Sequence, residues 1–503
     1  MISPLRLCLL LAVVVVTSYY VVLHARLVPI GHPTTQDEPG FVEITAAGNA
    51  FTRDGVLVCA SVYGPGYALW ARPFTAVIAN PYVAHRVASS AALFALLVLM
   101  GWELRRAGVG GLTTAAGLAI VYILNVSSHS LSACADLLGA ALGFAALAAS
   151  RRQTWPALFA GLVFAVLATL TKPYFALAWV IVASHQLLFA SPRRSAAYLG
   201  LSALVIGVTV LLLRWLAPYY YVSTFLTQQI AGERSLGVLT HQTAEFALLA
   251  GGLIVLALMA RPRVRRAHLG WRKAPMTPAM DVWTWATLVA TAALLGLLAW
   301  HPGNYLVYFY HLLLGPLVMV ALPRLADWPL AGRALLLANL LVLGWQLPPQ
   351  PGPDNWQTLA ANVTAAPGPV LGDALLEPLV HARPDLELLS HGQTASVLQS
   401  LDHLGLALPS RYAGLHRDLA ERAARLAERI RRREFAAIYI TYIDLGDRSV
   451  WAYELAPIRV ALFSSYRVAS EIPVFPYNAP YWDRRGHGQL AYRVTQWVPV
   501  RPE

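Results

Sequence analysis

Long apolar runs separated by short polar segments fill the chain from residue 7 to residue 345. They lie near 7–23, 84–103, 110–125, 134–150, 156–171, 174–190, 197–216, 244–260, 281–299, 305–322 and 329–345. A helix of about 20 apolar residues crosses the hydrocarbon core of a bilayer, so the pattern predicts eleven transmembrane helices. No small-residue cleavage site follows the first run, which favours a retained helix over a signal peptide.

Basic residues fall after every second run. Arg105–Arg106, Arg151–Arg152 and Arg193–Arg194 follow the second, fourth and sixth runs, and the loop 261–280 carries further arginines and Lys273. Because Arg and Lys concentrate in cytoplasmic loops, the amino terminus is expected in the cytoplasm. The first outer loop (24–83), the 217–243 loop and everything after residue 345 are then expected outside.

The composition changes after residue 345. A proline-rich linker occupies 346–354, followed by expected strands at 369–373, 435–442, 459–463 and 492–498 and a charged amphipathic helix over 412–433. These patterns are typical of a small α/β unit. The predicted fold class is therefore a mainly α polytopic membrane protein, with a transmembrane module over 1–345 and an extracytoplasmic α/β domain over 346–503.

Composition argues against a soluble globular protein and against a nucleic-acid-binding protein. Of the 503 residues, 57% are hydrophobic and 13% charged, whereas soluble proteins carry about 25% charged residues. The net charge of +12 comes from basic pairs between apolar runs and not from a basic patch interleaved with aromatics, so no nucleic-acid partner is expected. Cys59 and Cys134 would both face the outside, which permits a disulfide, although unpaired apolar cysteines are the simpler interpretation.

Asp37 and Glu38 stand side by side in the first outer loop. Acids next to a bilayer are costly to place, so they commonly do chemistry or bind cations. A carboxylate here could act as a general base towards an acceptor hydroxyl. The alternative is a solvated Asp-Glu-Pro-Gly turn before a helix, because acidic residues favour helix starts.

Three further charges lie at the outer ends of apolar runs. Asp136 heads the fourth run, either as a functional acid or as a carboxylate that meets the helix dipole. Lys172, in Thr171-Lys172-Pro173-Tyr174, is a rare cation in the short outer loops. It could bind a phosphate or snorkel to the membrane surface. Arg86 heads the second run.

These motifs, in this order, resemble the type C membrane glycosyltransferases over roughly residues 5–345. The resemblance is greatest to the group of dolichyl-phosphate-mannose protein mannosyltransferases and aminoarabinose transferases. It rests on Asp37-Glu38, on Tyr63-Gly-Pro-Gly-Tyr67, on the Arg86-Val-Ala-Ser entry into the second span, on Asp136 before a small-residue helix, and on Lys172-Pro173. The lysine that follows the tyrosine motif in aminoarabinose transferases is absent here, which leaves the sugar open.

The resemblance implies an inverting glycosyltransferase of a bacterial inner membrane, which moves a sugar from a polyprenyl-phosphate donor to an extracytoplasmic acceptor. Asp37 would be the base, with Glu38 and Asp136 supporting it or a divalent metal ion. Lys172 and Arg86 would bind the donor phosphate. Substrate-lining residues would be Tyr63, Tyr67 and His129. An O-antigen ligase or polymerase, or a secondary transporter, are the alternatives; a transporter would favour broken helices in matching halves.

Overall fold

The computed structural model describes most of the chain, with gaps in the long loops. The described residues are 3–34, 38–47, 52–53, 56–57, 64–127, 135–216, 236–259, 264–265, 279–297, 308–326, 328–345, 355–389, 421, 423–441, 456–474 and 493–500. Cys8 is a free, exposed cysteine. Cys59 and Cys134, the two cysteines that a disulfide would join, lie outside these residues.

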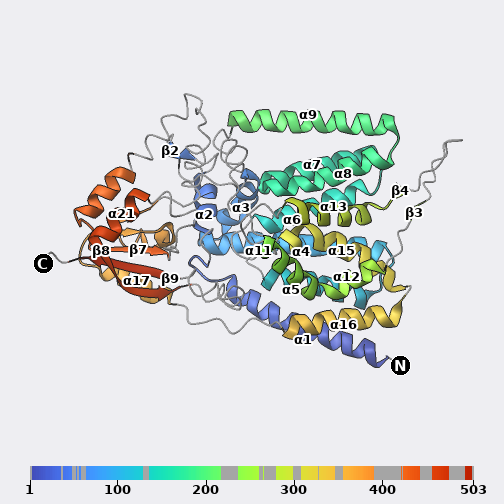
Figure 1. Cartoon of the computed structure of the whole chain (residues 1–503), viewed down its shortest axis with the longest axis horizontal. Coiled ribbons are helices and arrows are strands. Elements are labelled where there is room, and N and C mark those ends of the chain that lie inside the picture. The colour runs from blue at the N-terminus through green and yellow to red at the C-terminus, as the bar shows by residue number, and fades with distance from the viewer. Residues whose placement is uncertain are drawn as a thin grey trace.

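Each of the eleven apolar runs contains a described helix. They are α1 (Pro4–Leu27), α4 (Pro81–Arg106), α5 (Gly111–Ser127), α6 (Asp136–Ser150), α7 (Trp155–Thr171), α8 (Ala176–Phe189), α9 (Pro192–Leu216), α11 and α12 (Leu236–Leu249 and Gly251–Leu258), α13 (Val282–Leu297), α15 (Leu314–Ala321) and α16 (Pro329–Trp345). They lie alongside one another, with α9 at one edge and α1 and α16 at the opposite edge (Figure 1).

Length separates these helices into two classes. Within the described ranges, Pro4–Leu27, Pro81–Arg106 and Pro192–Arg214 are long and apolar enough to cross a membrane. The bent pair α11–α12 would make a fourth span, and the other apolar helices have 10–17 residues. A mostly helical chain with helices of spanning length is thus established, whereas the count of eleven spans stays a prediction.

The run predicted as one helix over 244–260 is broken. Its two halves, α11 and α12, meet at an angle of 83°. Asn339 of α16 bonds to both sides of the break, because its Nδ2 donates to the carbonyl of Leu249 (2.6 Å) and its Oδ1 accepts from the amide of Gly252 (3.0 Å). A Cβ at Gly252 would lie 2.5 Å from the carbonyl oxygen of Leu335, so the close helix approach requires glycine.

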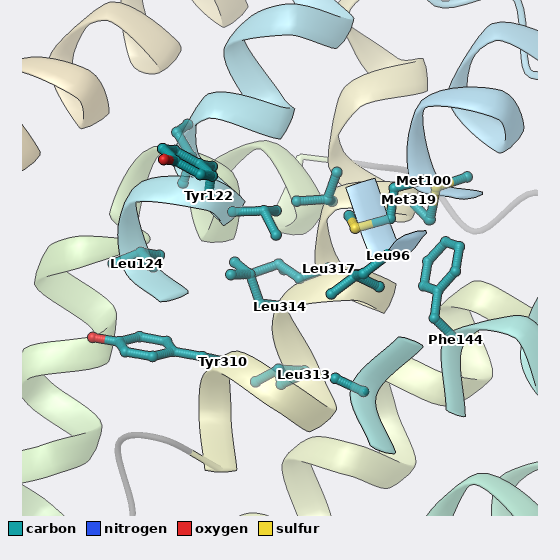
Figure 2. Close-up of a cluster of buried hydrophobic side chains, with 14 of the residues drawn as sticks. Leu96, Met100, Tyr122, Leu124, Phe144, Tyr310, Leu313, Leu314, Leu317 and Met319 are labelled. Carbon is teal, nitrogen blue, oxygen red and sulfur yellow. The ribbon is translucent and has the colours of Figure 1, made fainter. Parts of the chain in front are cut away.

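The core of the bundle is a continuous apolar cluster. Figure 2 shows side chains from α4, α5, α6 and α15 meeting there, among them Leu96, Tyr122, Phe144 and Leu317. Burial of such large side chains supplies most of the stability of a soluble core. In a membrane it supplies close van der Waals packing instead. Many exposed apolar side chains, such as Val15 and Leu211, lie on the outside of α1 and α9.

One end of the bundle collects the basic loops. Arg151 forms ion pairs with Glu103 at the end of α4 (3.3 Å) and with Asp281 before α13 (3.6 Å). Arg194 donates to the carbonyl of Gln153. The basic pairs after the second, fourth and sixth runs therefore share one end, as their spacing predicts. Which side of the membrane this end faces stays a prediction.

The last part of the chain forms a five-stranded sheet at the other end of the bundle (Figure 1). Its order is β6 (Leu386–Leu388), β5 (Val370–Gly372), β7 (Ala437–Thr441), β9 (Arg493–Pro499) and β8 (Tyr466–Pro473). Strands β6, β5 and β7 are parallel to one another. Strand β9 pairs antiparallel with β7, and β8 pairs antiparallel with β9.

Helices cover both faces of this sheet. Because alternate side chains of a strand point to opposite faces, β7 sends Tyr439 towards α17 (Trp356–Ala365) and the 3-10 helix η8 (Ala374–Leu379). It sends Ile438 towards α21 (Ala456–Ser465) and the helical residues 423–431. Sheet and helices together form an α/β arrangement. That residues 346–503 are a separate extracytoplasmic domain stays a prediction.

Three of the four expected strands are confirmed, because 369–373, 435–442 and 492–498 contain β5, β7 and β9. The strand expected at 459–463 is wrong, since these residues belong to α21. Ile458, Ala461, Leu462 and Ser465 are buried, and this i, i+3, i+4, i+7 spacing is that of one helix face. The expected helix over 412–433 is described at residue 421 and over 423–431, and it ends at 431.

Candidate active site

Glu38 and Arg86 form a buried ion pair at the end of the bundle that faces the sheet. Arg86 Nε and Nη2 donate to the two carboxylate oxygens of Glu38 at 2.8 and 2.7 Å, and both side chains are 0% exposed. Glu38 also accepts from the amide of Thr34 at 2.6 Å. Arg86 Nη1 donates to the carbonyl of Ile30, and Nη2 donates to that of His32 at 2.6 Å.

These contacts indicate a structural role for Arg86. Its guanidinium ties the residues 30–34 to α4 and to the start of α2 (Glu38–Ala47). A bidentate arginine–carboxylate pair fixes geometry as well as charge. With no exposed side-chain surface, Arg86 is better placed to position the segment leading into Asp37 than to bind a phosphate itself.

Tyr67 lies on α3 (Pro65–Val77) and joins α3 to α4 and α2. Its hydroxyl donates to the carbonyl of His85 at 3.1 Å and lies 3.0 Å from Oγ of Ser89. Its ring packs edge-on against Phe41 of α2, with centroids 5.1 Å apart. Tyr67 is 1% exposed, so it links the three helices and presents almost no surface to a substrate. The ring nitrogens of His85 have no hydrogen-bond partner among the described residues.

Asp136 and Lys172 form the second charged pair. Lys172 Nζ lies 2.9 Å from Oδ1 of Asp136, and the side chains are 14% and 4% exposed. The same oxygen accepts from the hydroxyl of Tyr174. His311 lies 3.2 Å from that hydroxyl and 3.6 Å from Oδ1 through its Nδ1. Three polar side chains from two other parts of the chain thus converge on one carboxylate oxygen of Asp136.

Aromatic rings surround the ammonium of Lys172. Its Nζ lies 5.1 Å from the ring centroid of Tyr174 and 5.5 Å from that of Tyr308. The two rings pack edge to face with centroids 4.6 Å apart. Rings within about 6 Å of a cation attract it through their negative faces. The arrangement therefore holds a charged lysine at the end of an apolar bundle, where a single charge would be costly.

Local backbone features place these side chains. Asp136 is the first residue of α6, and Lys172 directly follows α7 and precedes the 3-10 turn η2 (Pro173–Phe175). His311 lies in the π-helical turn η6 (Phe309–Leu313), a distortion that is frequent at functional sites. A Cβ at Gly139 would lie 2.0 Å from the ring of Phe175, so glycine lets α6 approach η2 closely.

The start of α3 brings the two charged pairs to the same end of the molecule. The amide of Gly64 donates to the carbonyl of Thr171 at 3.0 Å, directly before Lys172. A Cβ at Gly66 would lie 3.0 Å from the carbonyl oxygen of Leu170. The Gly-Pro-Gly motif therefore packs α3 against the end of α7, while Tyr67 holds the other side of α3 on α4.

The sheet packs on this end of the bundle. Tyr82, at the start of α4, donates its hydroxyl to Oε2 of Glu377 in η8 at 2.9 Å. The rings of His32 and Trp356 stack with centroids 4.7 Å apart. In Figure 1, α2 and α3 lie between the helical bundle and the sheet. The segment that Arg86 orders thus also contacts the sheet unit.

Three predicted site residues, Asp37, Tyr63 and His129, lie outside the described residues. Among the described ones, no group of three or more His, Cys, Asp or Glu side chains could hold a metal ion. Both oxygens of Glu38 are engaged by Arg86, and Asp136 bonds to Lys172. The described carboxylates thus do not offer a shared metal-binding set.

Sequence reasoning did not include Tyr174, Tyr308 and His311 in the site. The position of Tyr174, two residues after Lys172, could have indicated that it belongs to the site. His311 carries the weaker signal of an ionisable residue inside an apolar run. Tyr308 lies one turn before His311 on the same helix, and no pattern in the sequence distinguishes it from an interfacial tyrosine.

No family model and no curated protein sequence matches the chain. Among solved structures, it is similar to the crystal structure of ArnT from Cupriavidus metallidurans in the apo state. The TM-score is 0.49 and the identity 14%, over 95% of this chain and 98% of that one.

Proposed function

We propose that the chain is a membrane glycosyltransferase that transfers a sugar from a polyprenyl-phosphate donor to an acceptor outside the cytoplasm. The observation that carries the proposal is the pair of Lys172 and Asp136 at one end of an apolar helical bundle, enclosed by Tyr174 and Tyr308. A cation held at a membrane face suits a lipid-linked phosphate. The bacterial inner membrane is the proposed location.

In this reaction the acceptor hydroxyl oxygen attacks the anomeric carbon of the sugar. The bond from that carbon to the phosphate oxygen breaks, and the polyprenyl phosphate leaves with the bonding electron pair. Asp37 accepts the proton of the hydroxyl as a general base. Attack from the side opposite the leaving phosphate inverts the anomeric configuration.

Lys172 stabilises the charge that develops on the leaving phosphate. Its Nζ bonds to Asp136, which fixes the position of the ammonium. Fixed donors at a developing charge lower the barrier because they need no reorganisation during the reaction. Asp136 and Tyr174 hold Lys172 in position, whereas Glu38 and Arg86 position the segment that leads into Asp37.

The test combines a reconstituted reaction with a cellular one. The purified full chain in liposomes receives a radiolabelled polyprenyl-phosphate sugar and a cell-envelope extract, and transfer is followed as label in the acceptor and release of polyprenyl phosphate. Envelope glycans of a deletion strain are analysed by mass spectrometry. We expect transfer in the first and a missing sugar in the second. No transfer from any polyprenyl-phosphate sugar, together with unchanged envelope glycans, would contradict the proposal.

A further inference from the structure

Side chains at the start of α4 hold the backbone of residues 30–34, the segment that leads into the proposed base. Asn80 caps α4 by accepting from two amides of its first turn, and its Nδ2 donates to the carbonyl of Gly31 at 2.9 Å. Arg86 donates to the carbonyls of the residues on either side of Gly31. Three successive carbonyls are thus bound by donors from one end of one helix, so α4 fixes the path of the segment.

The sheet unit, which comprises the described residues from 355 onwards, contacts a side chain of the same segment. The imidazole of His32 stacks on the indole of Trp356, with ring centroids 4.7 Å apart and ring planes 8° from parallel. Nδ1 of His32 lies 3.0 Å from the carbonyl oxygen of Pro33, which restrains the orientation of the ring. Stacked aromatic rings attract one another beyond the area that they bury, so Trp356 restrains a ring that the segment carries.

Trp356 is itself held by the sheet unit. It is the first residue of α17, and it packs against the apolar cluster between this helix and the sheet, in which Leu359 and Tyr439 are 0% exposed. A second contact, from the hydroxyl of Tyr82 to Oε2 of Glu377, joins the sheet unit to α4 outside the segment. Of these two contacts, the stack alone involves the residues that lead into the proposed base.

We propose that Trp356 is a positioning residue of the transferase. Its indole holds the imidazole of His32, and through it residues 30–34, in the conformation that presents Asp37 to the acceptor hydroxyl. The inference rests on the proposed function and adds a role for the sheet unit in the chemical step. Displacement of a catalytic group by about 1 Å can lower a rate by about 10²-fold, and His32 lies five residues before Asp37.

The first experiment compares Trp356→Ala and Trp356→Phe in the purified full chain, with Tyr82→Phe as the matched control. Tyr82→Phe removes the hydrogen bond to Glu377 and leaves the stack in place. We expect Trp356→Ala to lower the single-turnover rate at saturating donor by about tenfold or more and to leave donor affinity unchanged. Trp356→Phe keeps a ring that can stack, so it should restore most of the rate. Tyr82→Phe should leave the rate near that of the unmodified chain.

Two results of this comparison would overturn the inference. Weaker donor binding at an unchanged single-turnover rate would place Trp356 in donor binding. Equal losses of rate in Trp356→Ala and Tyr82→Phe would mean that Trp356 only docks the sheet unit on the bundle.

His32 provides a test of the contact itself. His32→Ala should slow transfer about as much as Trp356→Ala, and the double variant should be no slower than either single variant, because each substitution already removes the stack. Additive losses in the double variant would show that the two side chains act independently and would overturn the inference.

The last readout does not depend on transfer. Hydrogen–deuterium exchange is followed in peptides that cover residues 28–34, with peptides of α9 as the internal reference. We expect faster exchange over 28–34 in Trp356→Ala and His32→Ala, but not in Trp356→Phe or Tyr82→Phe. Unchanged exchange in Trp356→Ala would overturn the inference. Faster exchange in these variants of a chain that transfers no sugar would overturn the transferase proposal and leave the restraint on residues 30–34 standing.

Discussion

In the proposed function, Lys172 binds the donor phosphate, and it also pairs with Asp136; substitutions can separate these two roles. Lys172→Ala should weaken donor binding by about tenfold to a hundredfold, because a charged hydrogen bond to phosphate contributes roughly 1.5–3 kcal/mol. It should also destabilise the protein, since Asp136 stays buried without its cation. Lys172→Arg should restore part of both. Titration of a polyprenyl-phosphate sugar and thermal unfolding measure the two effects.

The double variant Lys172→Met with Asp136→Asn is the control for this prediction. It removes both charges, so thermal stability should recover towards that of the unmodified chain. Donor affinity should stay low. If the double variant binds the donor normally, Lys172 is an interfacial lysine and the phosphate has another partner.

Asp37 is predicted to be the base, and Asp37→Asn should abolish transfer while leaving thermal stability near normal. The change is almost isosteric, and loss of a general base costs about 10²–10⁴-fold in rate. Single-turnover transfer rates at saturating donor provide the measurement. A rate within a few-fold of the unmodified chain would remove Asp37 from the mechanism.

Arg86 should behave as a positioning residue. Arg86→Met leaves the carboxylate of Glu38 buried without its partner, and breaking a buried pair costs about 3–5 kcal/mol. We therefore expect a large fall in the thermal midpoint. In Arg86→Met with Glu38→Gln, stability should partly return, and donor KM should change less than in Lys172→Ala. A stable Arg86→Met with a raised donor KM would instead make Arg86 a phosphate ligand.

Single residues also show where sequence reasoning ends. Asp136 and Lys172 are each recognisable as charges at the ends of apolar runs, but nothing in the sequence pairs residues 36 positions apart. A π-helical turn brings Tyr308 and His311 to the Asp136–Lys172 pair. No pattern in the sequence predicts that turn. The engaged guanidinium of Arg86 likewise follows from tertiary packing, which brings residues 30–34 against α4.

At the scale of elements, the approach of α6 to η2 is a second test of the site. A Cβ at Gly139 would lie 2.0 Å from the ring of Phe175 and 2.6 Å from Oγ1 of Thr171. Gly139→Ala should therefore push α6 away from the segment that carries Lys172. We expect lower donor affinity and lower thermal stability.

The control for Gly139→Ala is Gly143→Ala on the same helix. Its Cβ would meet Ala178 at 3.7 Å, an ordinary contact. This variant should keep donor affinity and gain up to about 1 kcal/mol of stability, because alanine favours helix over glycine. Equal effects of the two substitutions on donor affinity would argue against the close packing at Gly139.

The sequence predicts secondary structure best where the runs of apolar residues are long. All apolar runs contain helices because a run of this length has few other ways to bury its backbone in a membrane. The failures are local. The run 244–260 conceals a break that depends on Asn339, which is distant in sequence. The strand β8 was missed because its exposed face and buried face do not alternate regularly.

At the scale of the molecule, the two ends of the bundle are chemically different. One end collects Arg151 and Arg194 with their acidic and carbonyl partners. The other collects Glu38, Arg86, Asp136 and Lys172 and carries the sheet. The sequence predicts this difference between the ends, because basic residues follow every second apolar run. The packing of the sheet through Tyr82 and Trp356 had no sequence signal, because both residues also fit an interfacial aromatic belt.

This polarity makes the orientation in the membrane the most consequential prediction. We expect residue 270 in the cytoplasm and residue 450 outside, because the basic end should face the cytoplasm. Alkaline phosphatase, which is active outside the cytoplasm, and green fluorescent protein, which is fluorescent inside, are fused at each position. Phosphatase activity is expected at 450 and fluorescence at 270. The reverse pattern would place the Asp136–Lys172 pair in the cytoplasm, where an acceptor outside the cell membrane could not reach it.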